Sequence, residues 1–206
     1  MTASPDLGTP ATTSLGAVPT SIPAPAPVPL PPPPAVTGAL DPAAFDSTAF
    51  DSTAFRAVFR RHAAGVAVIT AAGTRPAGFT ATSLTSVSAE PPLLSFGIST
   101  TGSAWRTVAE ATHVGVHILG EHQEEVAATF ARSGADRFAP PTAWGPGPYG
   151  VPLLEDVQAW LVARVVARIP AGDHRIVVAQ AVAGAPGGEA ARPLLYHHGR
   201  YNALRH

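Results

Sequence analysis

From residue 65 onward, short apolar runs alternate with glycine, proline and polar residues, a pattern typical of a β-rich domain. The β-branched segment 66–70 predicts a buried strand, and segments 77–83 and 93–98 predict two more. In residues 113–119 every second position is apolar, so Val114, Val116 and Ile118 would share one face of a further strand. These segments together indicate a sheet as the main element of the fold.

Two long strands, 158–169 and 175–183, are predicted to flank a turn at residues 170–174. Segment 194–204 would end the sheet. Residues 137–152 hold five prolines and three glycines, which predicts a loop.

Three short helices are expected beside these strands. One would run over Phe55, Val58, Phe59 and His62, with Asp51, Ser52 or Thr53 as its N-terminal cap. The second covers 105–109, and the third covers 126–130 with Glu121, Glu124 and Glu125 on its polar side. Six or more strands with two or three short helices predict a mainly β fold, a barrel of the closed or split kind.

The N-terminal segment differs from this domain in composition. Residues 1–44 contain 12 of the 23 prolines and only two charged residues, so we expect a disordered arm. Its Pro-Ala alternation at 23–27 would suit an aromatic groove on a partner, although a solvated tail with no specific partner is the simpler interpretation. Residues 45–53, which include most of a tandem Ala-Phe-Asp-Ser-Thr duplication, are expected to be a linker to a domain at 54–204.

Composition excludes several function classes. The chain has no cysteine, and all 13 basic residues are arginines, so thiolate chemistry, iron–sulfur clusters and a lysine Schiff base are excluded. The formal net charge of −1 gives no basic stripe for nucleic acid. The sequence contains no run of 18 apolar residues, which would predict a membrane span, and no basic residue precedes Arg56, as a secretory signal would require. We therefore expect a cytoplasmic protein.

The most unusual window is 80–88, in which six of nine residues carry hydroxyls and none is charged. Such a surface suits a neutral, planar, hydrogen-bonding ligand, although a Thr-rich strand with a solvated face would look the same. The loop 99–103 precedes a helix, so its amides and hydroxyls could hold a phosphate, or could serve only as a cap.

Other candidate chemistry is limited. His113 and His117 would lie roughly 13 Å apart on a strand and could not share one metal ion, so we expect no metal site. No serine lies in a Gly-x-Ser-x-Gly elbow. His174, at the tip between the two long strands, is placed to hydrogen-bond a ligand over a barrel mouth, or is simply part of a soluble loop.

These features, in order, resemble the flavin reductase-like family of FMN-binding split barrels, which includes reductase components of two-component flavin monooxygenases. The resemblance covers about residues 54–204 and rests on the ordered segments Phe55-Arg56, 65–70, 78–88, Pro91-Pro92-Leu93, Phe130-Ala131, Gly172-Asp173-His174, 193–196 and Gly199-Arg200-Tyr201.

The resemblance implies the fold, the ligands and the residues that bind them. It implies a split β-barrel whose hydroxyl-rich segment contacts the flavin through Thr80, Thr82, Ser83, Ser86, Val87 and Ser88. It also implies that Thr100 and Ser103 hold the flavin phosphate, and that His174 lies near the nicotinamide. The sequence departs from the usual family pattern at Thr82, where many members have Asn, and in loop 99–103, which has no Arg or Lys; Arg106 or Arg132 would have to substitute.

The function implied is reduction of FMN, FAD or riboflavin by NADH or NADPH through direct hydride transfer. The reduced flavin would supply a partner monooxygenase, and the reductase would be a homodimer with the flavin near its interface. A flavin-binding module that stores or senses the cofactor without turnover is the alternative.

Overall fold

A computed structural model describes residues 50–187 and 192–204 of the chain. The predicted arm at 1–44 and residues 45–49 of the predicted linker lie outside the described residues. Within the described residues, no helix is long and apolar enough to cross a membrane.

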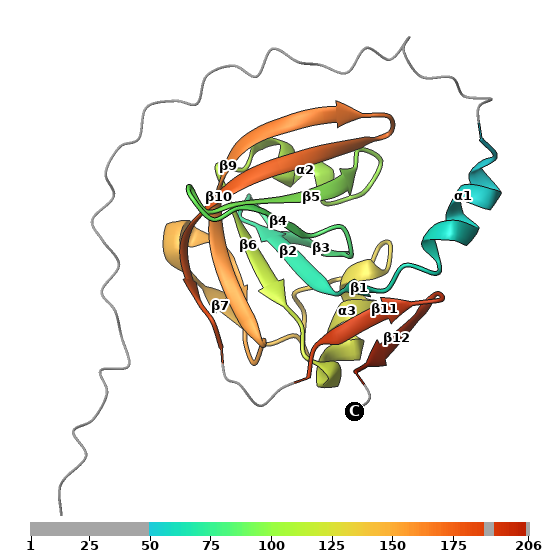
Figure 1. Cartoon of the computed structure of the whole chain (residues 1–206). Helices are drawn as coiled ribbons and strands as arrows, with labels where there is room; N and C mark the ends of the chain where they lie inside the picture. The colour runs from blue at the N-terminus through green and yellow to red at the C-terminus, as the bar shows by residue number, and fades with distance from the viewer. Residues whose placement is uncertain (1–49, 188–191, 205–206) are drawn as a thin grey trace, which may run out of the picture. The chain divides into compact units, whose positions relative to one another are not determined.

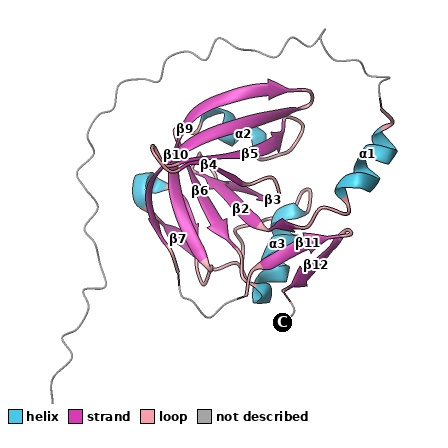
Figure 2. Ribbon diagram, in the orientation of Figure 1, coloured by secondary structure: helices cyan, strands magenta, loops and turns pink. Residues whose placement is uncertain are grey.

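Seven antiparallel strands form the main sheet, in the order β3-β2-β6-β9-β10-β5-β4 (Figures 1 and 2). Their bounds are β2 Ala67–Ala71, β3 Ala77–Ala81, β4 Thr85–Ser88, β5 Leu93–Ser99, β6 His113–Ile118, β9 Ala159–Ala171 and β10 His174–Ala185. Every strand expected between residues 66 and 183 is therefore present, and the mainly β prediction is confirmed. The turn between β9 and β10 is shorter than expected, because pairing continues to Ala171 and His174 and leaves only Gly172 and Asp173 outside it.

The two edge strands of this sheet, β3 and β4, follow each other directly in the chain. Only residues 82–84 separate them, so the sheet must curl until its edges come together. Ser83 joins the β3–β4 connection to β5, since its Oγ accepts a 2.9 Å hydrogen bond from the backbone N–H of Gly97. The Phe79 and Phe96 rings also meet inside, with centroids 6.0 Å apart. The result is a curled, incompletely closed barrel.

Two smaller sheets depart from the sequence-based prediction. Segment 194–204 does not extend the main sheet: β11 (Leu194–His197) and β12 (Arg200–Ala203) form a hairpin that pairs with β1 (Ala64–Gly65). His198 and Gly199 both have positive φ, 52° and 77°, and this tight turn breaks the segment in two. The predicted loop 137–152 likewise contains β7 (Trp144–Pro146), which pairs with β8 (Pro152–Leu154).

Helix α1 spans Ser52–Phe59, and its cap is Asp51, whose Oδ2 accepts a 2.8 Å hydrogen bond from the N–H of Ala54. The helix ends at Phe59, so the expectation that it would include His62 is wrong. None of its residues is buried, and Figure 1 shows it standing beside the barrel.

Two further helices cover the barrel. Helix α2 spans Trp105–Glu110 and buries Val108. The Arg168 guanidinium, from β9, donates to the carbonyls of Val108 and Ala111 and so satisfies the C-terminal end of α2. Helix α3 spans Glu124–Ala131 and buries Ala127 and Phe130. Short 3₁₀ turns cover Glu121–Gln123 and Pro148–Gly150.

The core has two parts. One fills the barrel and includes Ile69, Phe96, Val108, Val114 and Val116. The other lies between the sheet and α3 and includes Val66, Val68, Leu119, Phe130 and Leu194. Both faces of strand β6 are covered, since its residues 114–117 are all buried, and the single apolar face that alternation predicted is only half of the observed pattern.

Candidate functional site

A cavity of about 710 Å³ opens beside the joined edges of the barrel. Three segments far apart in the sequence surround it: α1 with the residues that follow it, the β3–β4 connection, and the β11–β12 turn. We call it the main cavity; it is lined by Phe55, Arg56, Phe59, Arg60, residues 62–65 and 82–85, and residues 196–199.

The walls of the main cavity combine three kinds of side chain. Phe55, Phe59 and Tyr196 provide aromatic surface, and the Phe55 and Phe59 rings lie 4.7 Å apart. Hydroxyls come from the β3–β4 connection, and Arg56 and Arg60 provide positive charge. Aromatic faces beside hydrogen-bonding groups suit a planar, polar, heteroaromatic ligand.

The residues expected to contact a flavin do not all reach this cavity. Thr82 and Ser83 line it. Thr80 lies on β3 with its hydroxyl donating to the Ala127 carbonyl of α3 at 2.6 Å, so that proton is already used within the protein. The Ser83 hydroxyl is also partly engaged, by the N–H of Gly97.

Ser86, Val87 and Ser88 lie on the edge strand β4. In its register Ser86 pairs with Leu94 and Ser88 with Leu93, and an irregularity between them leaves Val87 without a ladder partner. The Val87 side chain is 55% exposed. These three residues therefore form an accessible continuation of the hydroxyl segment beyond the main cavity.

His174 reaches the same region across strand β5. It pairs with Ser99, two residues from Gly97, and Gly97 is held by Ser83. Because neighbouring strands lie about 4.8 Å apart, Ser83 and His174 flank β5 at a separation of roughly 10 Å across the sheet.

The imidazole of His174 is half-exposed and held by its neighbour. Its Nδ1 lies 2.7 Å from Oδ1 of Asp173. The hydrogen bond and charge of His174 lower the pKa of the Asp173 carboxyl, and the charge of Arg56 lowers it further. With Nδ1 held by the carboxylate, Nε2 is left to face a ligand.

The predicted phosphate loop lies directly beside this turn. Both the backbone N–H and the hydroxyl of Thr100 donate to the Asp173 carbonyl at 2.9 Å, which ties the loop to the β9–β10 turn. Ser103 accepts a 3.0 Å hydrogen bond from Arg137 and, with it, lines a second cavity of about 300 Å³. Thr100 and Ser103 thus lie on one loop but face different surroundings.

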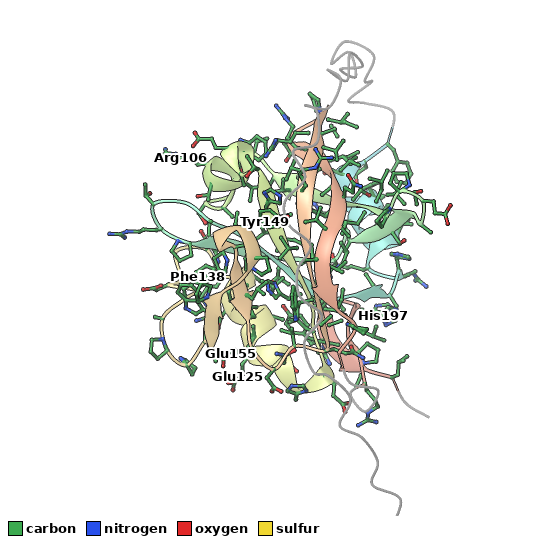
Figure 3. The ribbon with its side chains drawn as sticks, turned by 90° about the vertical axis from the view of Figure 1, so that its left-hand side faces the viewer. Arg106, Glu125, Phe138, Tyr149, Glu155 and His197 are labelled. Carbon is green, nitrogen blue, oxygen red and sulfur yellow. The ribbon has the colours of Figure 1, made fainter. Side chains whose placement is uncertain are left out.

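Several residues at these sites were missed by the sequence analysis. Arg137 donates a hydrogen bond to Ser103 of the predicted phosphate loop; its guanidinium also donates to the carbonyls of Phe130 and Arg132, and burial lowers its pKa. Arg60, His62, His197 and His198 line the main cavity. Figure 3 shows His197 on the opposite side of the β9–β10 hairpin from Phe138, so the two cavities lie on different sides of the molecule.

The histidines weighed as metal ligands have other partners. His117 is fully buried, with Nδ1 3.0 Å from the Val68 carbonyl and Nε2 accepting from the N–H of Leu154 at 3.1 Å. The His113 ring stacks on Tyr149 at 4.0 Å. Among the described residues, no group of three His, Asp or Glu side chains could hold a metal ion.

Comparison with known proteins gives one family. Residues 59–205 match the model of the flavin reductase like domain. The NADH:FMN oxidoreductase of Rhodococcus qingshengii is 46% identical over 150 residues, which are 71% of this chain and 78% of that protein. The reductase component of the 4-nitrophenol 4-monooxygenase/4-nitrocatechol 2-monooxygenase of Rhodococcus opacus is 36% identical over 147 residues, covering 71% of this chain and 77% of that component.

A solved structure agrees with this match. The crystal structure of a flavin reductase domain protein from Arthrobacter sp. FB24 superposes with a TM-score of 0.71 at 43% sequence identity, covering 75% of this chain and 96% of that one.

Proposed function

Because this chain belongs to the flavin reductase-like domain family, we propose that it transfers a hydride from NADH to FMN and supplies the reduced flavin to a partner monooxygenase. The observation that carries the proposal is the main cavity, in which hydroxyls from the β3–β4 connection face the aromatic wall of α1. The expected split-barrel fold is confirmed by the similar crystal structure.

In this reaction the protein binds the flavin and the nicotinamide and orients their rings. A bound flavin accepts the hydride at its ring, so no protein nucleophile is required, in agreement with a chain that lacks Cys and Lys. Thr82 and Ser83 hydrogen-bond the polar edge of the flavin, while Phe55 and Phe59 exclude water from one side of the cavity. His174, fixed by Asp173, orients the nicotinamide.

The remaining assignments extend along the same surface. Ser86, Val87 and Ser88 contact the flavin from β4, and Thr80 supports this segment through its bond to α3. Thr100, which is tied to the turn that carries His174, holds the flavin phosphate. Ser103 and Arg137 line the second cavity, on a different side of the molecule, so the expected role of Ser103 in holding this phosphate gains no support from its position. FMN is favoured over FAD and riboflavin, and NADH over NADPH, on the similarity to an NADH:FMN oxidoreductase.

The protein acts as a homodimer in the cytoplasm. Support for self-association comes from exposed apolar side chains on α1 and on the outer side of the sheet, among them Phe55, Val58, Val87 and Ile176. The monooxygenase partner is proposed from relatives that are reductase components of such enzymes.

The decisive test is oxidation of NADH and NADPH by the purified full-length protein under air, with FMN, FAD or riboflavin added in turn. The NADH–FMN pair is expected to give the highest kcat/KM. If none of the nicotinamide–flavin pairs gives a loss of absorbance at the reduced-nicotinamide band, the proposal is overturned. Tight flavin binding without turnover would instead favour a storage or sensing protein.

A further inference from the structure

The main cavity gathers basic side chains without acidic ones. Its lining contains no Asp or Glu, although the formal net charge of the chain is −1. The basic residues of the lining are two arginines and three histidines: Arg56, Arg60, His62, His197 and His198. In the described part of the chain, neither Arg56 nor Arg60 forms an ion pair with a carboxylate. The cavity therefore carries an excess of positive charge next to the hydroxyls of Thr82 and Ser83.

Helix α1 creates this arrangement through its periodicity. Phe55 and Phe59 are four residues apart, and so are Arg56 and Arg60, so each pair projects from neighbouring positions on successive turns. All four residues line the cavity. Arg61, the next residue, does not line it, which distinguishes the two cavity arginines from the other cation at this end of the helix.

We call the five basic residues of the lining the cationic wall; it is held in place at the C-terminal end of α1. The backbone N–H of His198 donates to the Arg60 carbonyl at 2.9 Å, which joins the end of α1 to the β11–β12 turn. The His197 and His198 rings meet edge to face, with centroids 4.3 Å apart. Two sides of the cavity, from segments nearly 140 residues apart, are thereby linked at their basic residues. The charge of Arg56 also acts on Asp173, beside His174, so it reaches the nicotinamide side of the proposed site.

The reaction itself changes the charge of both ligands. Hydride moves with its electron pair from the nicotinamide ring to the flavin ring, so the neutral nicotinamide becomes cationic and the neutral flavin ring becomes anionic. Positive charge near a flavin ring favours the anionic reduced form, and the same charge disfavours the cationic nicotinamide product. The first effect favours hydride transfer, and the second favours release of the oxidised nicotinamide afterwards.

Resting on the function proposed above, we infer that Arg56 and Arg60 make the main cavity selective for the anionic reduced flavin over the oxidised flavin. The phosphate of FMN carries the same charge in both redox states. A contact with the phosphate would strengthen the binding of oxidised and reduced FMN equally, whereas a contact with the ring would strengthen the binding of reduced FMN more.

The test compares dissociation constants of oxidised FMN and of dithionite-reduced FMN, measured anaerobically by equilibrium ultrafiltration. The full-length protein should bind reduced FMN at least about tenfold more tightly, which corresponds to about 1.4 kcal/mol. The double variant Arg56→Gln/Arg60→Gln should lose most of this difference through weaker binding of reduced FMN. Arg61→Gln should keep the difference, and added salt should reduce it in the unmodified protein, because the side chains involved are exposed.

Several outcomes would overturn the inference: equal affinities for the two forms in the unmodified protein, a double variant that keeps the difference, or one that weakens both forms alike. Circular dichroism should give the same melting temperature for all proteins, since α1 buries no side chain. Because dithionite replaces NADH in this test, NADH turnover without a redox preference would contradict only the inference. Failure to bind either form of FMN would contradict the proposed function as well.

Discussion

At the scale of single residues, His117 is the clearest case of a side chain whose protonation state is fixed by the fold. Its ring is fully buried between the Val68 carbonyl and the Leu154 N–H. Nδ1 carries the proton and donates to Val68, while Nε2 must stay unprotonated to accept from Leu154. Burial lowers the pKa of His117 to about 4, although the bond to Val68 partly opposes this.

This geometry predicts an acid-sensitive fold. The unfolded chain takes up a proton at His117 as the pH falls through about 6.5, whereas the folded chain does so only near pH 4. The stability from the neutral ring is therefore fully present above pH 6.5 and is lost progressively between pH 6.5 and 4, by roughly 3 kcal/mol. Urea denaturation at several pH values should show this slope.

The variant His117→Gln should be less stable at pH 7 but should show a shallower slope between pH 6.5 and 4. His62→Gln, at an exposed position, should keep the slope of the unmodified protein. An unchanged slope in His117→Gln would assign the acid sensitivity to other groups.

Substitution of His174 tests whether this residue serves NADH and not FMN. Replacing it with alanine removes the ring that Asp173 orients, so the KM for NADH should rise about five- to tenfold, as expected for loss of one hydrogen bond. The dissociation constant of FMN should change by less than about twofold. Steady-state kinetics and fluorescence titration measure the two quantities separately, and an unchanged KM would remove His174 from the nicotinamide site.

The sequence singled out segment 80–88 by its unusual composition and His174 by its place in the turn between two long strands, because both signals are local. It could not identify the cationic wall, because Arg56 and His197 come together only through the pairing of β11 with β1 and the bond between Arg60 and His198. Arg137 was missed for a related reason: its contact with Ser103 depends on the path of a loop whose prolines give no periodic pattern.

At the scale of elements, helix α3 and strand β3 approach so closely that only a glycine fits between them. A side chain at Gly78 would begin 2.7 Å from a ring carbon of Phe130 and 3.0 Å from the Ile69 carbonyl. Phe130 is fully buried, so it has no free space into which to move. The contact also fixes the end of β3 where Thr80 bonds to α3.

Gly78→Ala should therefore lower the free energy of unfolding by about 1–3 kcal/mol through overpacking. Gly65→Ala provides the control, since no atom lies within 4 Å of the added carbon and its backbone is not in the left-handed region. Urea denaturation at pH 7 gives both values. Equal stability of the two variants would show that α3 can shift without cost.

The elements themselves were predictable wherever strands are long and apolar, as for β2, β5, β6, β9 and β10. Prediction failed for β7 and β8, because three-residue strands with proline at their ends carry no alternation to detect. It also failed for β11 and β12, because His198 takes up a left-handed turn conformation that is uncommon for residues other than glycine. The order of the strands, and the joining of β3 to β5 through Ser83, depend on contacts that local patterns do not encode.

At the scale of the whole molecule, the outer side of the β5–β9–β10 sheet is the surface best suited to a second copy. Alternation along β10 places Val177 and Ala179 in the core, whereas Ile176 is 40% exposed on the outer side. Its neighbour across the ladder is Ile169 in β9. An apolar face of this kind is unusual on a monomer unless it binds something.

If the proposed homodimer forms through this surface, Ile176→Glu should convert it into a monomer, because two carboxylates would meet an apolar surface at the interface. Sedimentation velocity at assay concentration measures the change. Leu204→Glu changes an exposed apolar residue near the end of the chain and should leave the dimer intact. A monomeric unmodified protein would contradict the homodimer itself.

The pairing of β5 with β10 spans the longest stretch of sequence of any pairing in the main sheet, and it places Ser99 opposite His174. Loop closure over such a separation has a large entropic cost, so this pairing should form late, after the local β9–β10 and β2–β3 hairpins. That same pairing brings Thr100 to Asp173 and His174 toward Ser83. In refolding, secondary structure should therefore return before the capacity to bind flavin, and a chain emerging from the ribosome should stay inactive until nearly all of it has been synthesised.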